Sequence, residues 1–415
     1  MKTWLMGAGL AIACISAAHA ESTTTLYGLL YTGLRHVSDS GGNSVTGLAT
    51  GPSRWGIKGT ESLGSGRSAL FVLESGFDLS SGSSFQGRRL FGRQAYAGVS
   101  DVAAGRLTAG RQYDMVADFL APYAATGKWN GYIAHVGDND NLNYQFRLNN
   151  SIKYVSPDIG GVQAGAVYAM GESAGSGKPN SASSAGLRYR QGGFSAAAGY
   201  LRVNNPATSV PEGNWNTVVF PAVTPTSAIT PAALAPNAMT TYGIGADYQA
   251  DKLKYAVVYT QTRFDGLGSS AIGLPTSDVR FRNLEANVSF DATGHWMLGA
   301  GYAYTTGDVA ATRFKPKYHQ VHLVSNYSLS KRTILQLATA HQRAAGDARN
   351  AYVLYSSESG ASQGRSQTAL LAGMFHFFDP PCGRWSGFPP LPCWSMLGML
   401  GGSQITARTR GLSTP

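Results

Sequence analysis

Apolar and polar residues alternate along most of the chain, as in NNSIKY (149–154), LEANVSF (284–290) and HWMLGAGYAYT (295–305). Successive side chains of a β-strand point to opposite faces, so each such segment predicts a strand with one apolar face and one polar or small face. About sixteen segments follow this pattern. Their predicted bounds are 24–37, 53–61, 67–78, 89–99, 105–112, 148–156, 161–170, 183–191, 193–203, 240–249, 253–263, 279–290, 295–306, 317–329, 332–343 and 366–378.

Aromatic residues lie near the ends of several predicted strands, namely Tyr27, Tyr154, Phe290, Tyr304 and Tyr327. A soluble β-sandwich shows the same alternation, but aromatic residues at strand ends favour a membrane barrel, in which they lie at the lipid–water interfaces. We therefore predict an all-β protein, a sixteen-stranded antiparallel transmembrane β-barrel.

The connections between predicted strands alternate between short and long. Residues 291–294 and 329–332 are short turns, whereas 38–52, 204–239, 264–278 and 344–365 are long. Short periplasmic turns and long external loops are typical of outer-membrane barrels, and an even strand number places both barrel ends in the periplasm. Another connection, from Tyr113 to Phe146, exceeds thirty residues. We expect it to fold inward, because sixteen strands leave an aqueous channel unless something narrows it.

The first twenty residues predict a secretory signal peptide, with Lys2, an apolar core and Ala18-His19-Ala20 before a cleavage site. An N-terminal anchor is the alternative. Beyond this segment no run of about twenty apolar residues predicts a transmembrane helix. The three cysteines are Cys14, Cys382 and Cys393, so residues 21–378 contain none and do not depend on disulfides.

Several motifs together resemble the trimeric general porins of Gram-negative bacteria, specifically those of β-proteobacteria. The resemblance covers residues 21–378, and its motifs are TLYGLL (25–30), SRWGIKGTESLGSG (53–66), LESGFDL (73–79), RRLFGRQAYAGVS (88–100), GRQYD (110–114), RLNNSIKYVSPDIGG (147–161), DATGHWMLGAGYAYT (291–305), YSLSKRT (327–333) and AGMFHFF (372–378). It implies export to the bacterial outer membrane, a homotrimer among outer-membrane lipids and lipopolysaccharide, and a water-filled channel for small hydrophilic solutes and ions.

The resemblance also implies a constriction between an acidic third loop and a basic wall. The wall residues carried over are Arg54, Arg93, Arg147, Lys58 and Arg111, and the loop residues are Asp114, Asp118, Asp138 and Asp140. Strand parity supports part of this set independently. Arg54 and Lys58 share one face of the 53–61 strand, and Arg147 and Lys153 share one face of the segment that follows the loop. An arginine near the membrane midplane on the lipid face costs roughly 2–4 kcal/mol, so these faces should line the lumen.

Three positions depart from the family pattern or from strand parity. Tyr31 stands where the family often has an acidic residue, which removes a candidate lumen carboxylate if Tyr31 faces inward. Residues 61–64 read ESLG where the family often has EDLG. If Arg93 faces the lumen as part of a strand, Gln94 and Tyr96 are expected to face outward.

The charge balance predicts a weak to moderate preference for anions. The chain has 33 basic and 23 acidic residues, a net charge of +10. Without Lys2, Asp379 and the arginines at 384, 408 and 410, 29 basic and 22 acidic residues remain, a net charge of +7 for residues 21–378. A cationic lumen concentrates anions. Nucleic-acid binding is not predicted, because the basic residues are spread over alternating strands.

The segment LLAGMFHFF, Leu370 to Phe378, resembles the last strand of these barrels, whose terminal phenylalanine is an assembly signal for the outer-membrane assembly machinery. It must pair with the first strand, because an open edge in lipid leaves backbone groups unsatisfied. Residues 379–415 continue beyond it with six prolines and no strand period. We expect a disordered translated extension; a genuine periplasmic tail is the alternative.

Other functions have weaker support. A substrate-selective porin and a structural or adhesive barrel stay open, although the second should carry a plug or periplasmic domain, and no such domain is evident in the sequence. Ser325, His322 and His341 form no catalytic motif, so an enzyme is not predicted. No cofactor or metal site is predicted, because His319 and His322 fall on opposite faces of one strand. The role of the proline-rich 204–239 loop is open.

Overall fold

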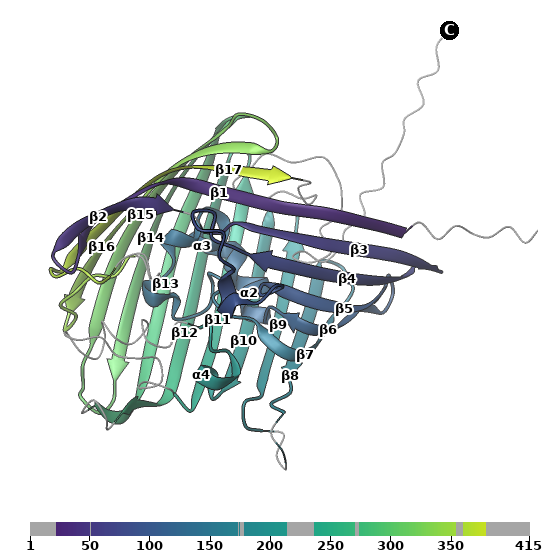
Figure 1. Cartoon of the computed structure of the whole chain (residues 1–415), viewed down its shortest axis with the longest axis horizontal. Helices are drawn as coiled ribbons and strands as arrows, with labels where there is room; N and C mark the ends of the chain where they lie inside the picture. Colours follow the sequence, from purple (N-terminus) through teal and green to yellow (C-terminus); the bar gives the residue numbers. More distant parts are fainter. Residues whose placement is uncertain are drawn as a thin grey trace, which may run out of the picture.

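The computed structural model describes residues 22–49, 51–172, 174, 178–213, 236–269, 274–353 and 360–378. These residues form one antiparallel sheet that closes on itself (Figure 1). Closure joins β1 (Ser22–Ser40) to β17 (Ser366–Phe378), in a register that runs from Gly28 opposite Phe378 to Val37 opposite Ala369. The predicted pairing of the last strand with the first is thus confirmed. The predicted signal peptide and the extension after Phe378 lie outside the described residues.

Seventeen strand segments make sixteen barrel strands, as predicted. β1 pairs along its first half with β3 (Arg54–Gly64) and along its second half with β2 (Asn43–Ala49). β2, which ends at Ala49, and β3, which begins at Arg54, are therefore two parts of a single barrel strand. The predicted long loop 38–52 is wrong, because a tight turn at Gly41 and Gly42, both with positive φ, starts a hairpin there.

Each of the remaining strands pairs with its neighbours in the sequence, and the turns at the end that carries both barrel termini are short. These strands are β4 (Arg67–Gly76), β5 (Gln94–Asp101), β6 (Gly105–Gln112), β7 (Leu148–Val155), β8 (Val162–Ala169), β9 (Ala182–Gln191), β10 (Phe194–Asn204), β11 (Ala238–Ala250), β12 (Leu253–Ser269), β13 (Leu274–Thr293), β14 (Trp296–Val309), β15 (Pro316–Ser328) and β16 (Thr333–Gly346). The predicted long connection 264–278 is also wrong, because β12 and β13 extend into it.

The helices are short and lie in the connections. They are α1 (Phe85–Arg88), α2 (Met115–Leu120), η1 (Ala121–Tyr123), α3 (Ala125–Lys128), η2 (Gly131–Ile133), η3 (Val136–Asp138) and α4 (Pro206–Ser209). None of the helices in the described part of the chain is long and apolar enough to cross a membrane. Of the seven helices within the described residues, five belong to the connection between β6 and β7.

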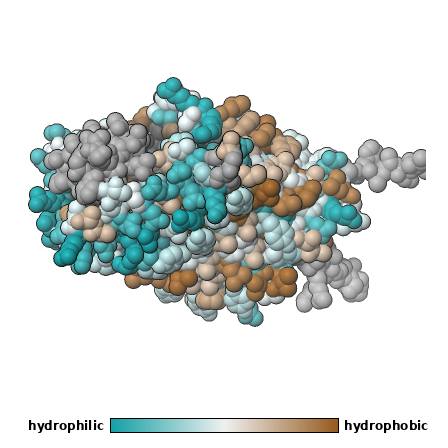
Figure 2. Space-filling view, turned by 90° about the horizontal axis from the view of Figure 1, so that it is seen from below, coloured by the Kyte–Doolittle hydropathy of each residue, from teal (hydrophilic) through white to brown (hydrophobic). Residues whose placement is uncertain are grey.

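The two faces of the strands differ as the alternation predicts. In β7, Ile152 and Tyr154 are 48 % and 43 % exposed on the outside, whereas Ser151 and Lys153 are buried inside. Figure 2 shows hydrophobic residues in patches over the strands and hydrophilic residues gathered toward one end. The expected interface position of Tyr27 is wrong, because its side chain faces inward and its hydroxyl donates a 3.0 Å hydrogen bond to Glu74.

The connection between β6 and β7, residues 113–147, is called the inner loop here. Its side chains contact inward-facing residues on two opposite walls, so the loop crosses the interior of the barrel. At its start, α2 packs Met115 and Phe119 in a buried cluster with residues of β8 to β13. At its middle, Trp129 packs in a second cluster with Tyr31 and Phe375 of β1 and β17, among others. Apolar burial on both walls therefore holds the loop across the lumen.

Candidate functional site

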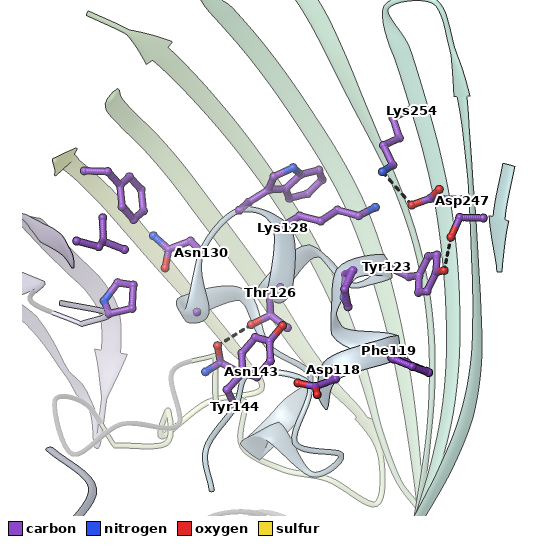
Figure 3. A pocket seen from close by; sticks show the side chains of 18 of the residues that line it. Asp118, Phe119, Tyr123, Thr126, Lys128, Asn130, Asn143, Tyr144, Asp247 and Lys254 are labelled. Carbon is purple, nitrogen blue, oxygen red and sulfur yellow. Dashed lines mark hydrogen bonds and ion pairs between the residues drawn. The ribbon is translucent and has the colours of Figure 1, made fainter. Parts of the chain in front are cut away.

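A cavity of about 330 Å³ lies between the inner loop and the barrel wall (Figure 3). The wall contributes inward-facing residues of β1, β3, β9, β11, β12 and β17, and the loop contributes residues from Asp118 to Tyr144. We call this space past the loop the passage, and the residues that line it are the candidates for the predicted constriction.

Arg54, Arg93 and Arg147, three of the four wall arginines selected from the sequence, lie together around two partners. Arg93 Nε donates to Glu74 Oε1 at 2.6 Å, and Arg54 Nε lies 3.8 Å from Glu74 Oε2. The Tyr113 hydroxyl accepts hydrogen bonds from Arg93 Nη2 at 2.9 Å and from Arg147 Nη2 at 2.6 Å. One carboxylate thus stabilises a buried cluster of like charges, which keeps an excess of positive charge.

Of these three arginines, Arg54 and Arg93 line the cavity, whereas Arg147 lies behind them and stacks on the Tyr113 ring at 4.7 Å. The expected outward orientation of Gln94 and Tyr96 is wrong, because both side chains are buried and Tyr96 packs inside. Arg93 precedes the first residue of β5, so strand parity does not connect it to its neighbours.

Arg111 and Lys58 lie apart from this cluster. Arg111 forms an ion pair with Glu212, which follows α4 in the connection after β10, and Glu212 also lies 3.5 Å from Arg89. Lys58 Nζ lies 5.2 Å from the centre of the Tyr27 ring. Neither Arg111 nor Lys58 lines the cavity.

The four predicted acidic residues of the inner loop take different positions. Asp118 lines the cavity and accepts a 2.6 Å hydrogen bond from Lys153 Nζ. Asp114 caps α2, accepting from the backbone amides of Val116 and Ala117 at 2.8 and 3.0 Å. Burial raises the pKa of Asp114 to about 6. Its carboxylate therefore orders the start of the loop and is turned away from solvent.

Asp138 and Asp140 are buried within the inner loop, and His135 contacts both Asp140 and Glu285 of the barrel wall. His135 Nδ1 donates to Asp140 Oδ2 at 2.7 Å, and His135 Nε2 lies 3.1 Å from Glu285 Oε2 on β13. Burial acts to lower the pKa of His135, but the two carboxylates raise it to about 10. Burial and Asp140 raise the pKa of Asp138. At neutral pH an imidazolium thus bridges the loop and β13.

Two further contacts join the loop to the wall at β13. The backbone amide of Ala125 donates to Glu285 Oε1 at 2.6 Å, and Lys128 Nζ donates to Asn287 Oδ1 at 2.7 Å. Burial lowers the pKa of Lys128 to about 7. Lys128 also lines the cavity, so the same ammonium group holds the loop to β13 and faces the passage.

Basic residues outnumber acidic ones among the residues that line the cavity. Asp118 and Asp247 are the carboxylates, and Lys254 Nζ lies 2.9 Å from Asp247 Oδ2. The basic residues are Arg54, Arg93, Lys128, Arg188, Arg190 and Lys254.

Sequence reasoning missed Glu74, Glu212, His135 and Glu285, which organise the basic residues and the loop. Their partners lie 19 or more residues away for Glu74 and about 100 or more for Glu212 and Glu285, so spacing alone does not connect them. Strand parity could have identified two of them. Glu74 and Glu285 lie on the inward faces of their strands, where an acidic residue in a basic lumen is expected to pair with a basic one.

Comparisons with known proteins identify the family and the fold. The family described as Gram-negative porin matches residues 8–347. An outer membrane porin protein of Bordetella pertussis is 30 % identical over 380 residues, covering 81 % of this chain and 92 % of the relative. Outer membrane porin protein 32 of Delftia acidovorans is 29 % identical over 400 residues, covering 88 % and 97 %.

Among solved structures, the anion-selective porin from Comamonas acidovorans superimposes with a TM-score of 0.66 at 25 % identity, covering 86 % of this chain and all of that porin. A trimer form of an outer membrane protein of Vibrio cholerae superimposes with a TM-score of 0.63 at 14 % identity, which supports the fold alone.

Proposed function

The chain belongs to the Gram-negative porin family, and we propose that its passage conducts anions in preference to cations. It is an outer-membrane β-barrel, a passive channel for small hydrophilic solutes and ions rather than an enzyme. Solutes diffuse down their gradients and are released as readily as they enter.

The charge balance of the cavity supports the proposed anion preference. Six basic residues and two carboxylates line it, and each carboxylate already has a lysine partner at 2.6 or 2.9 Å. Positive charge in a narrow passage with low-dielectric walls raises the local concentration of anions. The similar porin from Comamonas acidovorans is described as anion-selective, which is the same preference as the one proposed here.

We assign the predicted site residues to three roles. Arg54 and Arg93 form the basic side of the passage, supported from behind by Arg147 through Tyr113. Asp118 is the loop carboxylate that faces the passage. The remaining three, Asp114, Asp138 and Asp140, hold the loop in shape through buried hydrogen bonds. Arg111 and Lys58 do not line the cavity, so they receive none of these three roles.

Reversal potentials across planar bilayers test this proposal. In a tenfold KCl gradient, the full-length protein should give the sign of chloride preference. The double variant Arg54→Gln/Arg93→Gln should lose most of that preference, whereas Lys331→Gln, an exposed charge in the turn between β15 and β16, should keep it. A wild-type potential with the sign of potassium preference would contradict the proposal.

A homotrimer is part of the same proposal, as are contacts with outer-membrane lipids, lipopolysaccharide and the assembly machinery. Conductance that rises in groups of three equal steps, and chemical cross-linking that stops at three subunits, are the expected results. Single independent steps with monomers in the cross-linking experiment would contradict the trimer. Phe378 ends β17, the position that an assembly signal of this family occupies.

A further inference from the structure

An apolar strip faces the passage on one side. It consists of Leu29 on β1 and of Phe375 and Phe377 on β17, three inward-facing residues that pack in the cluster with Trp129 and present only their edges to the cavity, with 2 %, 4 % and 6 % of their surface exposed. The two phenylalanine rings stack with centroids 6.4 Å apart and planes at 21°. The interior of a barrel of this kind is ordinarily polar, so an apolar strip at the passage is an exception that calls for an explanation.

The strip lies directly beside the arginines. Leu29 pairs with Arg54 of β3 on one side and with Phe377 of β17 on the other, so the three residues form one row across neighbouring strands. Neighbouring strands are about 4.8 Å apart, which puts the backbones of Arg54 and Phe377 roughly 10 Å apart. Arg93 continues the row, because it packs against Gly76, the residue that pairs with Arg54.

The inner loop faces this row with aromatic and amide groups. Trp129, Asn130, Asn143 and Tyr144 line the cavity there, and Thr126 donates a 2.9 Å hydrogen bond to Asn143. In Figure 3, Asn130 and Asn143 lie in the left half of the view, and the Lys254–Asp247 pair lies at the upper right. A solute between the loop and the row thus meets cations, an apolar surface and neutral polar groups.

Resting on the proposed anion preference, we infer that this juxtaposition is a subsite for small carboxylates that carry an apolar ring, such as aryl carboxylates. The carboxylate lies against Arg54 and Arg93, and the ring lies against the edges of Leu29 and Phe377. Both contacts fit one small molecule, because the row places them about two strand spacings apart. Acetate or chloride makes only the first contact. The subsite therefore ranks anions by shape, which charge alone does not do.

Partial block of the chloride current measures this ranking. Benzoate and acetate are titrated against the full-length protein in planar bilayers. Benzoate should reach half-block at a concentration roughly three- to tenfold lower than acetate, the range expected for one aromatic contact. Phe377→Thr and, separately, Leu29→Thr should bring the ratio close to one while the protein still prefers chloride over potassium.

Leu371→Thr is the matched control, because Leu371 is an inward-facing residue of β17 that does not line the cavity. It should keep the wild-type ratio. If Phe377→Thr fails to assemble beside the terminal phenylalanine, Leu29→Thr on the other strand decides the question. Equal block by benzoate and acetate in the wild type would overturn the inference, as would equal effects of Leu29→Thr and Leu371→Thr. Cation preference in a KCl gradient would instead overturn the proposed function.

Discussion

Replacing His135 by glutamine tests how firmly the inner loop is held across the barrel. His135 is almost fully buried and contacts two carboxylates, Asp140 within the loop and Glu285 on β13. Without the imidazolium, both carboxylates keep other donors, Thr260 for Asp140 and the Ala125 amide for Glu285, but lose the cation between them. The change therefore acts on the docking of the loop and leaves the strands paired.

The pKa of His135 gives the magnitude. The pKa rises from 6.5 to about 10 when the loop is docked, and at about 1.4 kcal/mol per unit this difference corresponds to roughly 5 kcal/mol. Removing one partner of a buried ion pair costs about 3–5 kcal/mol, which is similar. Since each 1.4 kcal/mol is a factor of ten, His135→Gln should raise the released fraction of the loop at least about a hundredfold.

Hydrogen exchange of the loop amides is the assay, with Ala125 and Trp129 as reporters because their amides are hydrogen-bonded in the docked loop. His322→Leu is the control: His322 is equally buried, and neither of its ring nitrogens has a hydrogen-bond partner among the described residues. The docking contribution of His135 should be complete below pH 6.5 and should be lost as the pH rises toward 10. Wild-type protection of Ala125 in His135→Gln would refute the reasoning.

Three further results are expected. Lys128 has a pKa of about 7, so the anion preference should fall as the pH rises from 6 to 8, and reversal potentials of Lys128→Met should lack that change; an unaltered pH profile would exclude Lys128 as its source. Glu212→Gln leaves Arg111 and Arg89 without their carboxylate, so it should shift the reversal potential further toward anions, whereas Glu61→Gln on an exposed position should not; equal shifts would point to a general effect of net charge. Ending the chain at Phe378 should increase the yield of folded, heat-modifiable trimer on gels, because the terminal phenylalanine is no longer followed by residues 379–415; equal yields would count against masking of the signal.

The strand count was predictable because lipid and lumen impose opposite demands on alternate residues. Period two therefore survives in almost every strand of the sequence. Loop lengths were less predictable. Gly41 and Gly42 allow a tight turn that extends β1 and adds β2, and only the pairing partners show this. The wall arginines came from the family resemblance and, for Arg54 and Arg147, also from parity.

The partners of these residues were not predictable, because they depend on which strands become neighbours and on how the loop crosses the barrel. His135 meets Glu285 across 150 positions of the chain, and Asp114 turned toward its own helix rather than the lumen. The sequence of β17 did indicate a contact on its inner face. LLAGMFHFF is apolar on both faces, whereas a strand between lipid and water needs only one apolar face. In the structure its inner face packs against the inner loop.

That packing bears on the order in which the barrel is made. The buried cluster around Trp129 includes Leu29 and Tyr31 from the first strand and Phe375 and Phe377 from the last. These residues come from opposite ends of the chain and meet when β1 and β17 pair. Before that pairing the cluster around Trp129 is incomplete, so we expect the loop to finish docking only after the barrel has closed. We therefore expect the passage to reach its final width only after β1 and β17 have paired.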